Sequence, residues 1–172
     1  MTIPRPDLPF VAIDFETADH GRDSACAVAL VRVEDGRIVA RAKRLIRPPR
    51  RGFVFTHIHG ISWRDVQHEP PFAGVWPTLT YLLEDASTLV AHNASFDRGV
   101  LRRCCEASGL PMPPQPFECT VRLARRTWPS LYSARLNVVC EHLHIPLVHH
   151  DAQSDAEACA RIMIEVQKAS GR

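Results

Sequence analysis

Residues 10–17 read Phe-Val-Ala-Ile-Asp-Phe-Glu-Thr, an apolar run that ends in two acids. A short apolar run of this length predicts a buried strand. Asp14 and Glu16 are two residues apart on it, so both side chains point to the same face. Ligands of open α/β sheets bind beyond the carboxyl ends of the strands, which makes the two acids candidates for a ligand site. By itself, the pair is more typical of two solvated acids at the end of a strand.

The segments that follow predict the remainder of an α/β fold. Two stretches rich in Val, Ile and Ala flank Asp35-Gly36, a dipeptide typical of tight hairpin turns. After this hairpin, short strands alternate with helices, which predicts a mixed sheet covered by helices. Pro77 confines or kinks one of these helices. The expected strands cover 10–15, 25–34, 37–47, 88–91 and 117–119, and the expected helices cover 73–84, 95–108, 120–127, 135–143 and 152–168.

The composition is that of an ordinary globular protein of one domain. The 172 residues are 45% hydrophobic and 23% charged and carry a formal net charge of +2, which argues against disorder and identifies no partner. No apolar run approaches the roughly 20 residues that span a bilayer, and the N-terminus lacks the apolar stretch of a signal peptide. We therefore expect a cytoplasmic protein without a membrane partner, whose six cysteines are reduced core residues. The expected organisation is an N-terminal extension over 1–9, one domain over 10–168 and a C-terminal tail over 169–172.

Two further acids lie on apolar faces of predicted helices. Asp97 is in register with Val100 and Cys104, and Asp155 is in register with Cys159. Taken singly, each is also explained as a first-turn acid that the helix dipole favours. Four acids directed at one interior are costly unless a positive charge joins them, and no Lys or Arg lies on these stripes. A hard divalent cation is the natural compensating charge, and without the four acids the chain carries a formal +6.

Arginine and lysine gather in two groups. Residues 41–51 hold six of them and no acid, and a second group surrounds the predicted helix that carries Asp97. Such clusters suit a phosphate backbone, and they are equally typical of a solvated strand or helix face. The two groups comprise Arg41, Lys43, Arg44, Arg47, Arg50 and Arg51, and Arg98, Arg102, Arg103, Arg122, Arg125 and Arg126.

Three segments taken together resemble a known family. Residues 14–17 (Asp-Phe-Glu-Thr), 92–97 (His-Asn-Ala-Ser-Phe-Asp) and 150–155 (His-Asp-Ala-Gln-Ser-Asp) are similar to the three exonuclease motifs of the DEDDh 3′–5′ exonucleases. The segments occur in the family's order, and smaller signatures lie between them at 59–62 and 119–125. The similarity extends from about Val11 to Val166. Position 119 is Cys where many relatives have Asp, which removes no motif ligand.

The resemblance implies a ribonuclease-H-like fold, a five-stranded mixed sheet of antiparallel hairpin strands and parallel strands flanked by helices. It implies a metal-dependent 3′–5′ exonuclease that hydrolyses nucleic acid, preferably single-stranded DNA ends, to nucleoside 5′-monophosphates. The implied cofactors are two divalent cations, Mg²⁺ or Mn²⁺, in a two-metal-ion mechanism. The implied residues are Asp14, Glu16, Asp97 and Asp155 as catalytic metal ligands, His150 as general base, and Thr17, Ala18, His59 and Phe96 near the terminal nucleotide.

Several alternatives remain open. An exonuclease of the same family that acts on RNA differs only in its treatment of the 2′-hydroxyl, and a catalytically silent domain would bind nucleic acid or a partner. The stretch 140–150 is rich in Cys and His, although its spacing fits no standard zinc pattern. The chain ends shortly after the last motif, so we expect no polymerase-binding segment in it, and we expect a monomer or a homodimer. His150 is also compatible with a surface histidine, and His92 is more typical of a core histidine.

Overall fold

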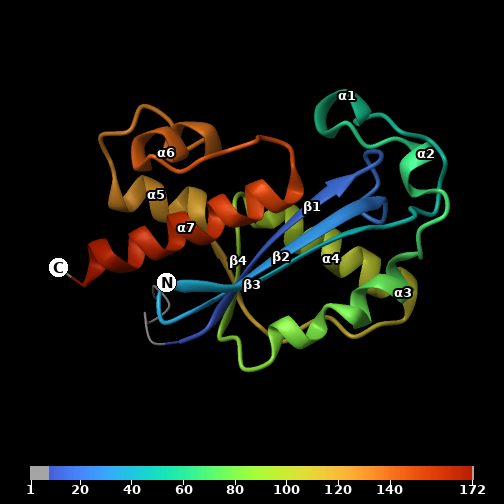
Figure 1. The fold of residues 1–172 in the computed structure, drawn as a ribbon, viewed down its shortest axis with the longest axis horizontal. Helices are drawn as coiled ribbons and strands as arrows, with labels where there is room; N and C mark the ends of the chain where they lie inside the picture. The colour runs from blue at the N-terminus through green and yellow to red at the C-terminus, as the bar shows by residue number, and fades with distance from the viewer. Residues whose placement is uncertain (1–7, 172) are drawn as a thin grey trace.

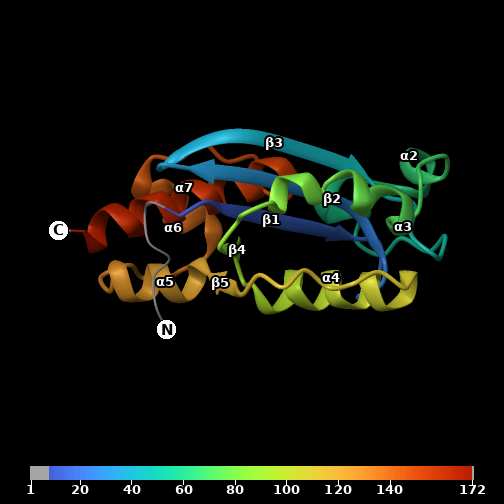
Figure 2. The same cartoon turned by 90° about the horizontal axis from the view of Figure 1, so that it is seen from below.

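The computed structural model describes residues 8–171, which contain a five-stranded sheet (Figures 1 and 2). The strand order is β3-β2-β1-β4-β5. Neighbours are antiparallel from β3 to β1, whereas β4 and β5 run parallel to β1. The predicted mixed sheet is therefore confirmed. The strands are β1 (Phe10–Thr17), β2 (Ala25–Glu34), β3 (Arg37–Leu45), β4 (Thr88–Ala91) and β5 (Phe117–Cys119).

Helices cover both faces of this sheet. In Figure 1, α5, α6 and α7 gather on one side of the long strands, and α3 and α4 lie on the other side. No helix among residues 8–171 is both long and apolar enough to cross a membrane. The helices are α1 (Thr56–His59), α2 (Trp63–Val66), α3 (Phe72–Val75), α4 (Ser95–Ser108), α5 (Thr120–Thr127), α6 (Leu136–Leu143) and α7 (Ala152–Ser170), with two 3₁₀ turns, η1 (Trp76–Thr78) and η2 (Thr80–Leu83).

The alternation of side chains along β1 decides which face carries the acids. The odd-numbered side chains from 11 to 15 pack in the core layer that includes residues of α3 and α4. Phe10 and Ala12 pack in the opposite layer, beneath α7. Asp14 and Glu16 continue this second set, because alternate side chains of a strand share a face. The two acids therefore emerge on the α7 side, at the carboxyl end of β1.

One predicted helix is wrong, whereas most other elements are present with ends shifted by a few residues at most. The expected helix over 73–84 is replaced by the four-residue α3 and the turns η1 and η2. Pro77 lies at the start of η1. Proline has no amide hydrogen for the next helical bond, and its ring clashes with the preceding turn, so an α-helix does not continue through it. The four-residue helices α1 and α2 are too short to show a periodic pattern, and the sequence did not predict them.

The ends of the described region are anchored to the sheet and to α7. The carbonyl oxygen of Pro9 accepts hydrogen bonds from the amide and the hydroxyl of Ser87, at 2.8 and 2.9 Å. Helix α7 continues to Ser170, beyond the end expected at residue 168. Residues 1–7 and 172, which hold most of the expected extension and the end of the expected tail, lie outside the described residues. All six cysteines are buried and free, as expected of reduced core residues.

Candidate active site

Three of the four predicted acids meet where β1 ends against the start of α7. One carboxylate oxygen from each of Asp14, Glu16 and Asp155 lies within 4.8 Å of the other two. The β2 residues that pair with Asp14 and Glu16 are Ala29 and Ala27. Their small side chains leave room for the carboxylates between the sheet and the helix. The close approach of three like charges is unusual in a structure that serves stability alone.

The fourth acid, Asp97, reaches the cluster from the other layer of the fold. It lies in the first turn of α4 and is 1% exposed. Its Oδ1 accepts a hydrogen bond of 3.1 Å from the amide of Phe15, the residue between the two acids of β1. Asn93 has a φ of 68°, a left-handed conformation that turns the chain sharply between β4 and α4. Asp97 is thereby attached to the sheet beside Asp14. The hydrogen bond from Phe15 uses only Oδ1 of its carboxylate.

The loop before α7 determines the position of Asp155. Asp151 caps the helix, because its Oδ1 accepts hydrogen bonds from the amides of Gln153 and Ser154 at 3.1 and 3.0 Å. Its other carboxylate oxygen forms an ion pair with Lys43 of β3. The cap and the ion pair together hold the first turn of α7 against the sheet. Asp155, in that turn, is 6% exposed.

His150 lies in the same loop and stays at the rim of the cluster. Its φ of 67° is left-handed, which directs its amide toward Asp155 Oδ2 at 3.1 Å. Its ring is exposed and makes an edge contact with the ring of His149, with 3.9 Å between centroids. The pKa of His150 lies below its ordinary value, chiefly because of desolvation and then because of His149, while Asp155 opposes the shift. The imidazole is therefore neutral at pH 7 and able to accept a proton.

Burial raises the pKa of all four acids. Desolvation is the largest cause for each of them, and it brings the pKa of Glu16 to about 8 and that of Asp97 to about 7. The pKa of Asp14 lies well above its ordinary value, because burial is reinforced by the charges of Asp97 and Glu16. The pKa of Asp155 is also raised, against the opposing hydrogen bond from the loop amide. Without a compensating cation, the cluster therefore holds protons at neutral pH.

The donor set fits a hard divalent cation. Asp155 Oδ1 is buried and has no hydrogen-bond partner. Within the described part of the chain, none of the four acids forms an ion pair. Carboxylate oxygens are the ligands that Mg²⁺ and Mn²⁺ prefer. A divalent cation would provide a partner for the buried Asp155 Oδ1 and a compensating charge for the four acids, whose pKa values are raised.

The Cys and His side chains of the stretch 140–150 do not gather at one point. Cys140 is buried in α6, and His142 packs against an indole ring. Across residues 8–171, only His149 and His150 of this stretch belong to a group of potential metal ligands, and the third member of that group is Asp155. The arrangement does not support the alternative of a zinc-binding module.

His59 connects the α1 segment to the end of β1. The amide of Ile61 donates to His59 Nδ1 at 3.1 Å, so the proton of the neutral ring resides on Nε2. Nε2 lies 3.1 Å from the carbonyl oxygen of Thr17 and donates to it. Burial lowers the pKa of His59, which favours this neutral form. The ring of His59, which is predicted to contact the nucleotide, is therefore oriented by a hydrogen bond at each of its nitrogens.

The other residues predicted near the nucleotide differ in exposure. Phe96 is half-buried against the core layer of α4. Thr17 is buried, and Ala18 is fully buried in a small cluster with Cys26 and Val66. The amide of Ala18 donates to a carbonyl of the β1–β2 loop, and its carbonyl accepts from the amide of residue 54. Ala18 therefore supports the end of β1 through packing and backbone bonds.

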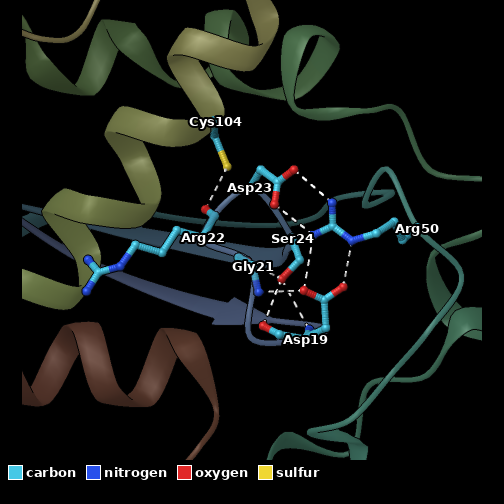
Figure 3. A network of polar contacts seen from close by, with 7 residues as sticks. All are labelled: Asp19, Gly21, Arg22, Asp23, Ser24, Arg50 and Cys104. Carbon is cyan, nitrogen blue, oxygen red and sulfur yellow. Dashed lines mark hydrogen bonds and ion pairs between the residues drawn. The ribbon is translucent and has the colours of Figure 1, made fainter.

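The loop between β1 and β2 is held by Arg50 (Figure 3). The guanidinium donates to both carboxylate oxygens of Asp19, at 2.9 and 3.1 Å, and to both of Asp23, at 2.8 and 2.7 Å. Arg22 leaves the same loop in the other direction and donates to the carbonyl of Ser95 at 2.9 Å. The loop thus ties the start of α4, which carries the fourth acid, to the end of β1. The sequence grouped Arg50 with candidate phosphate contacts and did not predict this role.

A cavity of about 550 Å³ opens onto the cluster. Asp14, Asp155 and His150 line it, together with Arg125 and Arg135. The volume is in the range of small-molecule and cofactor sites. Arg135 lies outside the two basic groups that the sequence indicates, although it belongs to a segment without acids, residues 119–140.

A sheet ordered β3-β2-β1-β4-β5, with acids at the end of β1 and at the starts of α4 and α7, defines a ribonuclease-H-like nuclease of the DEDDh type. The chain matches the family described as exonuclease (RNase_T) over residues 11–163, and it belongs to that family. The predicted resemblance is thereby confirmed, and so is the predicted class of domain, an exonuclease.

Relatives of several kinds share this similarity. DNA polymerase III PolC-type of Halalkalibacterium halodurans is 33% identical over 171 residues, which is 96% of this chain and 12% of the relative. The 3′-5′ exonuclease DinG of Bacillus subtilis is 32% identical over 162 residues, which is 91% of this chain and 17% of the relative. The chain thus spans less than a fifth of these curated relatives.

Two solved structures match this chain over most of their own chains. Exonuclease X in complex with 5′ overhanging duplex DNA has a TM-score of 0.78 and 30% identity, with 95% of this chain and 93% of that chain covered. The nuclease domain of 3′hExo, a DEDDh family member bound to rAMP, has a TM-score of 0.77 and 18% identity, with 93% and 92% covered. At that identity, the second likeness supports the fold alone.

Proposed function

We propose that this protein is a metal-dependent 3′–5′ exonuclease that removes nucleoside 5′-monophosphates from nucleic acid, with single-stranded DNA ends preferred. The observation that carries the proposal is the buried carboxylate cluster: three acids with oxygens within 4.8 Å, no ion-pair partner in the described chain and one orphaned oxygen. The proposed exonuclease unit is a single domain over residues 10–168.

Asp14, Glu16, Asp97 and Asp155 would hold two divalent cations, Mg²⁺ or Mn²⁺. Bound there, such ions would supply positive charge that neutralises the phosphoryl oxygens and would lower the pKa of a bound water. The protein's own contribution is to assemble four carboxylates that repel one another. Attachment of Asp97 to the Phe15 amide and of Asp155 to the His150 amide supplies part of that assembly.

His150 would accept the proton of the attacking water. Its neutral imidazole at pH 7 and its exposed ring at the rim of the cluster suit a general base that must meet water. The amide of the same residue donates to Asp155, so the base is positioned by one of the metal ligands. His149, in edge contact with the ring, carries no proposed role.

Thr17, His59 and Phe96 would contact the terminal nucleotide, with Phe96 as a surface for base stacking. The hydrogen bonds that orient His59 toward the end of β1 support its inclusion. Ala18 belongs to this group through its position after Thr17. Its buried side chain suits a packing role in the wall of the site.

DNA is the proposed substrate because the relatives of at least 30% identity include DNA polymerases and exonuclease X in complex with 5′ overhanging duplex DNA. RNA is the alternative within the family, since the 2′-hydroxyl alone separates the two substrates. A polymerase partner would follow from the PolC-type relatives, but no feature of this chain argues for one. A cytoplasmic location and a monomeric or dimeric state stay predictions.

The test is cleavage of a 5′-labelled single-stranded DNA and of its RNA counterpart with Mg²⁺ or Mn²⁺. We expect a ladder that shortens from the 3′ end and disappears with EDTA and in Asp14→Asn. Asp35→Asn, in the exposed turn between β2 and β3, is the matched control and should cleave like the wild type. A folded, metal-loaded protein that cleaves neither substrate would refute the proposal and favour a silent binding domain.

A further inference from the structure

The arginines of the α5–α6 region have no acidic partner among the described residues, in contrast to Arg41, Lys43 and Arg50 of the group at 41–51. In the group at 41–51, Arg41 pairs with Glu157, Lys43 with Asp151, and Arg50 with two aspartates. Half of that group is therefore neutralised within the chain, whereas Arg44, Arg47 and Arg51 form no ion pair among the described residues. The arginines of residues 119–140 have no ion-pair partner within the described chain.

The segment 119–140 contains four arginines and no acid. Arg122, Arg125 and Arg126 follow the i, i+3, i+4 spacing and are exposed on one face of α5. The opposite face buries Leu123 and Ala124 in the core layer shared with α7. Helix α5 is thereby held beside α7, and α6 lies on the same side of the sheet (Figure 1). The fourth arginine, Arg135, is exposed directly before α6.

The cavity connects this basic surface to the carboxylate cluster. Arg125 and Arg135 line the same 550 Å³ cavity as Asp14 and Asp155. Neither Glu16 nor any residue predicted near the terminal nucleotide lines it. The cavity therefore approaches the acids on a different side from the end of β1, and it combines acids that suit cations with guanidinium groups that suit phosphates.

We propose that Arg125 and Arg135 bind the phosphates on the 5′ side of the bond that is cut. This inference rests on the proposed function. In a strand with a free 3′-hydroxyl, the bond cut by a 3′–5′ exonuclease carries the last phosphate, so every other phosphate of that strand lies on its 5′ side. Neighbouring phosphates are joined through one sugar, so when the last phosphate lies at Asp14 and Asp155, the next ones must lie close by. The cavity wall formed by Arg125 and Arg135 supplies unpaired positive charge in that vicinity.

The arrangement gives the enzyme a dependence on chain length. A dinucleotide with one internal phosphate has no phosphate for these arginines, whereas a ten-nucleotide strand has several. The two guanidinium groups would then help to bind and place the retained strand. They would take no part in the cleavage of the phosphodiester bond itself. They are positioning residues in this sense.

The first experiment measures binding of a fluorescent ten-nucleotide single-stranded DNA in EDTA, where no cleavage occurs, over a series of salt concentrations. For single strands, the slope of log K against log salt changes by about 0.7 for each phosphate contact. We expect the slope to become shallower by about 0.7 in Arg125→Gln and in Arg135→Gln, and by about 1.4 in the double variant. Arg37→Gln, an exposed arginine at the start of β3 without an ion-pair partner in the described residues, is the matched control and keeps the wild-type slope.

The second experiment compares kcat/KM for a dinucleotide and for the ten-nucleotide strand. We expect each substitution to reduce kcat/KM for the longer strand roughly tenfold, in line with the loss of a hydrogen bond to a charged group. The reduction of kcat/KM for the dinucleotide should be much smaller. Equal losses on both substrates, or an unchanged salt slope, would overturn the inference. A wild-type protein that cleaves neither substrate would refute the proposed function instead, and the binding slopes would then test the arginine surface independently.

Discussion

The metal-free protein should lose stability as the pH rises from 6.5 to 8, and Glu16 should account for a measurable share of the loss. Burial raises the pKa of Glu16 from 4.5 to about 8. In this interval the unfolded chain has already released the proton that the folded chain still holds. The folded state therefore binds more protons, and the free energy of unfolding falls with rising pH until the folded pKa is reached.

The magnitude follows from the pKa of Glu16. The interval from pH 6.5 to the folded pKa near 8 is about 1.5 units, and each unit corresponds to about 1.4 kcal/mol. Glu16 is partly exposed, which screens the effect, so we expect a loss of about 1–2 kcal/mol. The lower limit of pH 6.5 avoids the opposite contribution of His92, whose pKa burial lowers to about 4. The upper limit avoids the buried cysteines, whose raised pKa values act at higher pH.

The assay is urea denaturation in EDTA at pH 6.5 and at pH 8, for the wild type, Glu16→Gln and Glu141→Gln. Glu141 is an exposed acid of α6, so the same change there should leave the wild-type pH dependence intact. Glu16→Gln should flatten it by about 1–2 kcal/mol, and Mg²⁺ should stabilise the wild type more at pH 8 than at pH 6.5. The same pH dependence in Glu16→Gln and in the wild type would refute the reasoning, since Glu16 would then carry no raised pKa.

Two further predictions concern residues around the cluster. His150→Ala should lower kcat by about 10²–10⁴-fold, as expected of a general base, while calorimetric titration with Mn²⁺ finds metal affinity largely retained; equal loss of both would make His150 a structural residue. Arg50→Ala should lower the free energy of unfolding at pH 6 by about 1 kcal/mol, because Asp19 and Asp23 lose their charged partner. The guanidinium lowers the pKa of both aspartates, so this difference should disappear as the pH falls below about 4. An unchanged urea midpoint of Arg50→Ala at pH 6 would show that the ion pairs of Arg50 with Asp19 and Asp23 do not stabilise the fold.

Local sequence determines most of the secondary structure and the residues of the candidate site. The apolar run of β1 with its two acids, the Asp35-Gly36 turn and the helical stripes through Asp97 and Asp155 are all properties of neighbouring residues. Such patterns are visible because strand and helix periods act over a few positions. The prediction of one helix across Pro77 was wrong, because proline cannot donate the helical hydrogen bond and its ring clashes with the preceding turn.

Tertiary structure alone decides how these groups are used. The attachment of Asp97 to the Phe15 amide joins residues 82 positions apart, and the pairing of Arg41 with Glu157 joins residues 116 positions apart. Neither contact has a local signature, since charged residues of solvated faces and of binding surfaces look alike in a sequence.

The same limit applies to the arginines near the site. The sequence contains both the arginine group at 41–51 and the arginines of 119–140, and it supplies no means to separate them. The fold places acids opposite Arg41, Lys43 and Arg50 of the first group, and it leaves Arg125 and Arg135 of the second facing a cavity lined by Asp14 and Asp155. Which charges are neutralised within the chain and which remain available to a ligand depends on distances between distant segments, and only packing determines those distances.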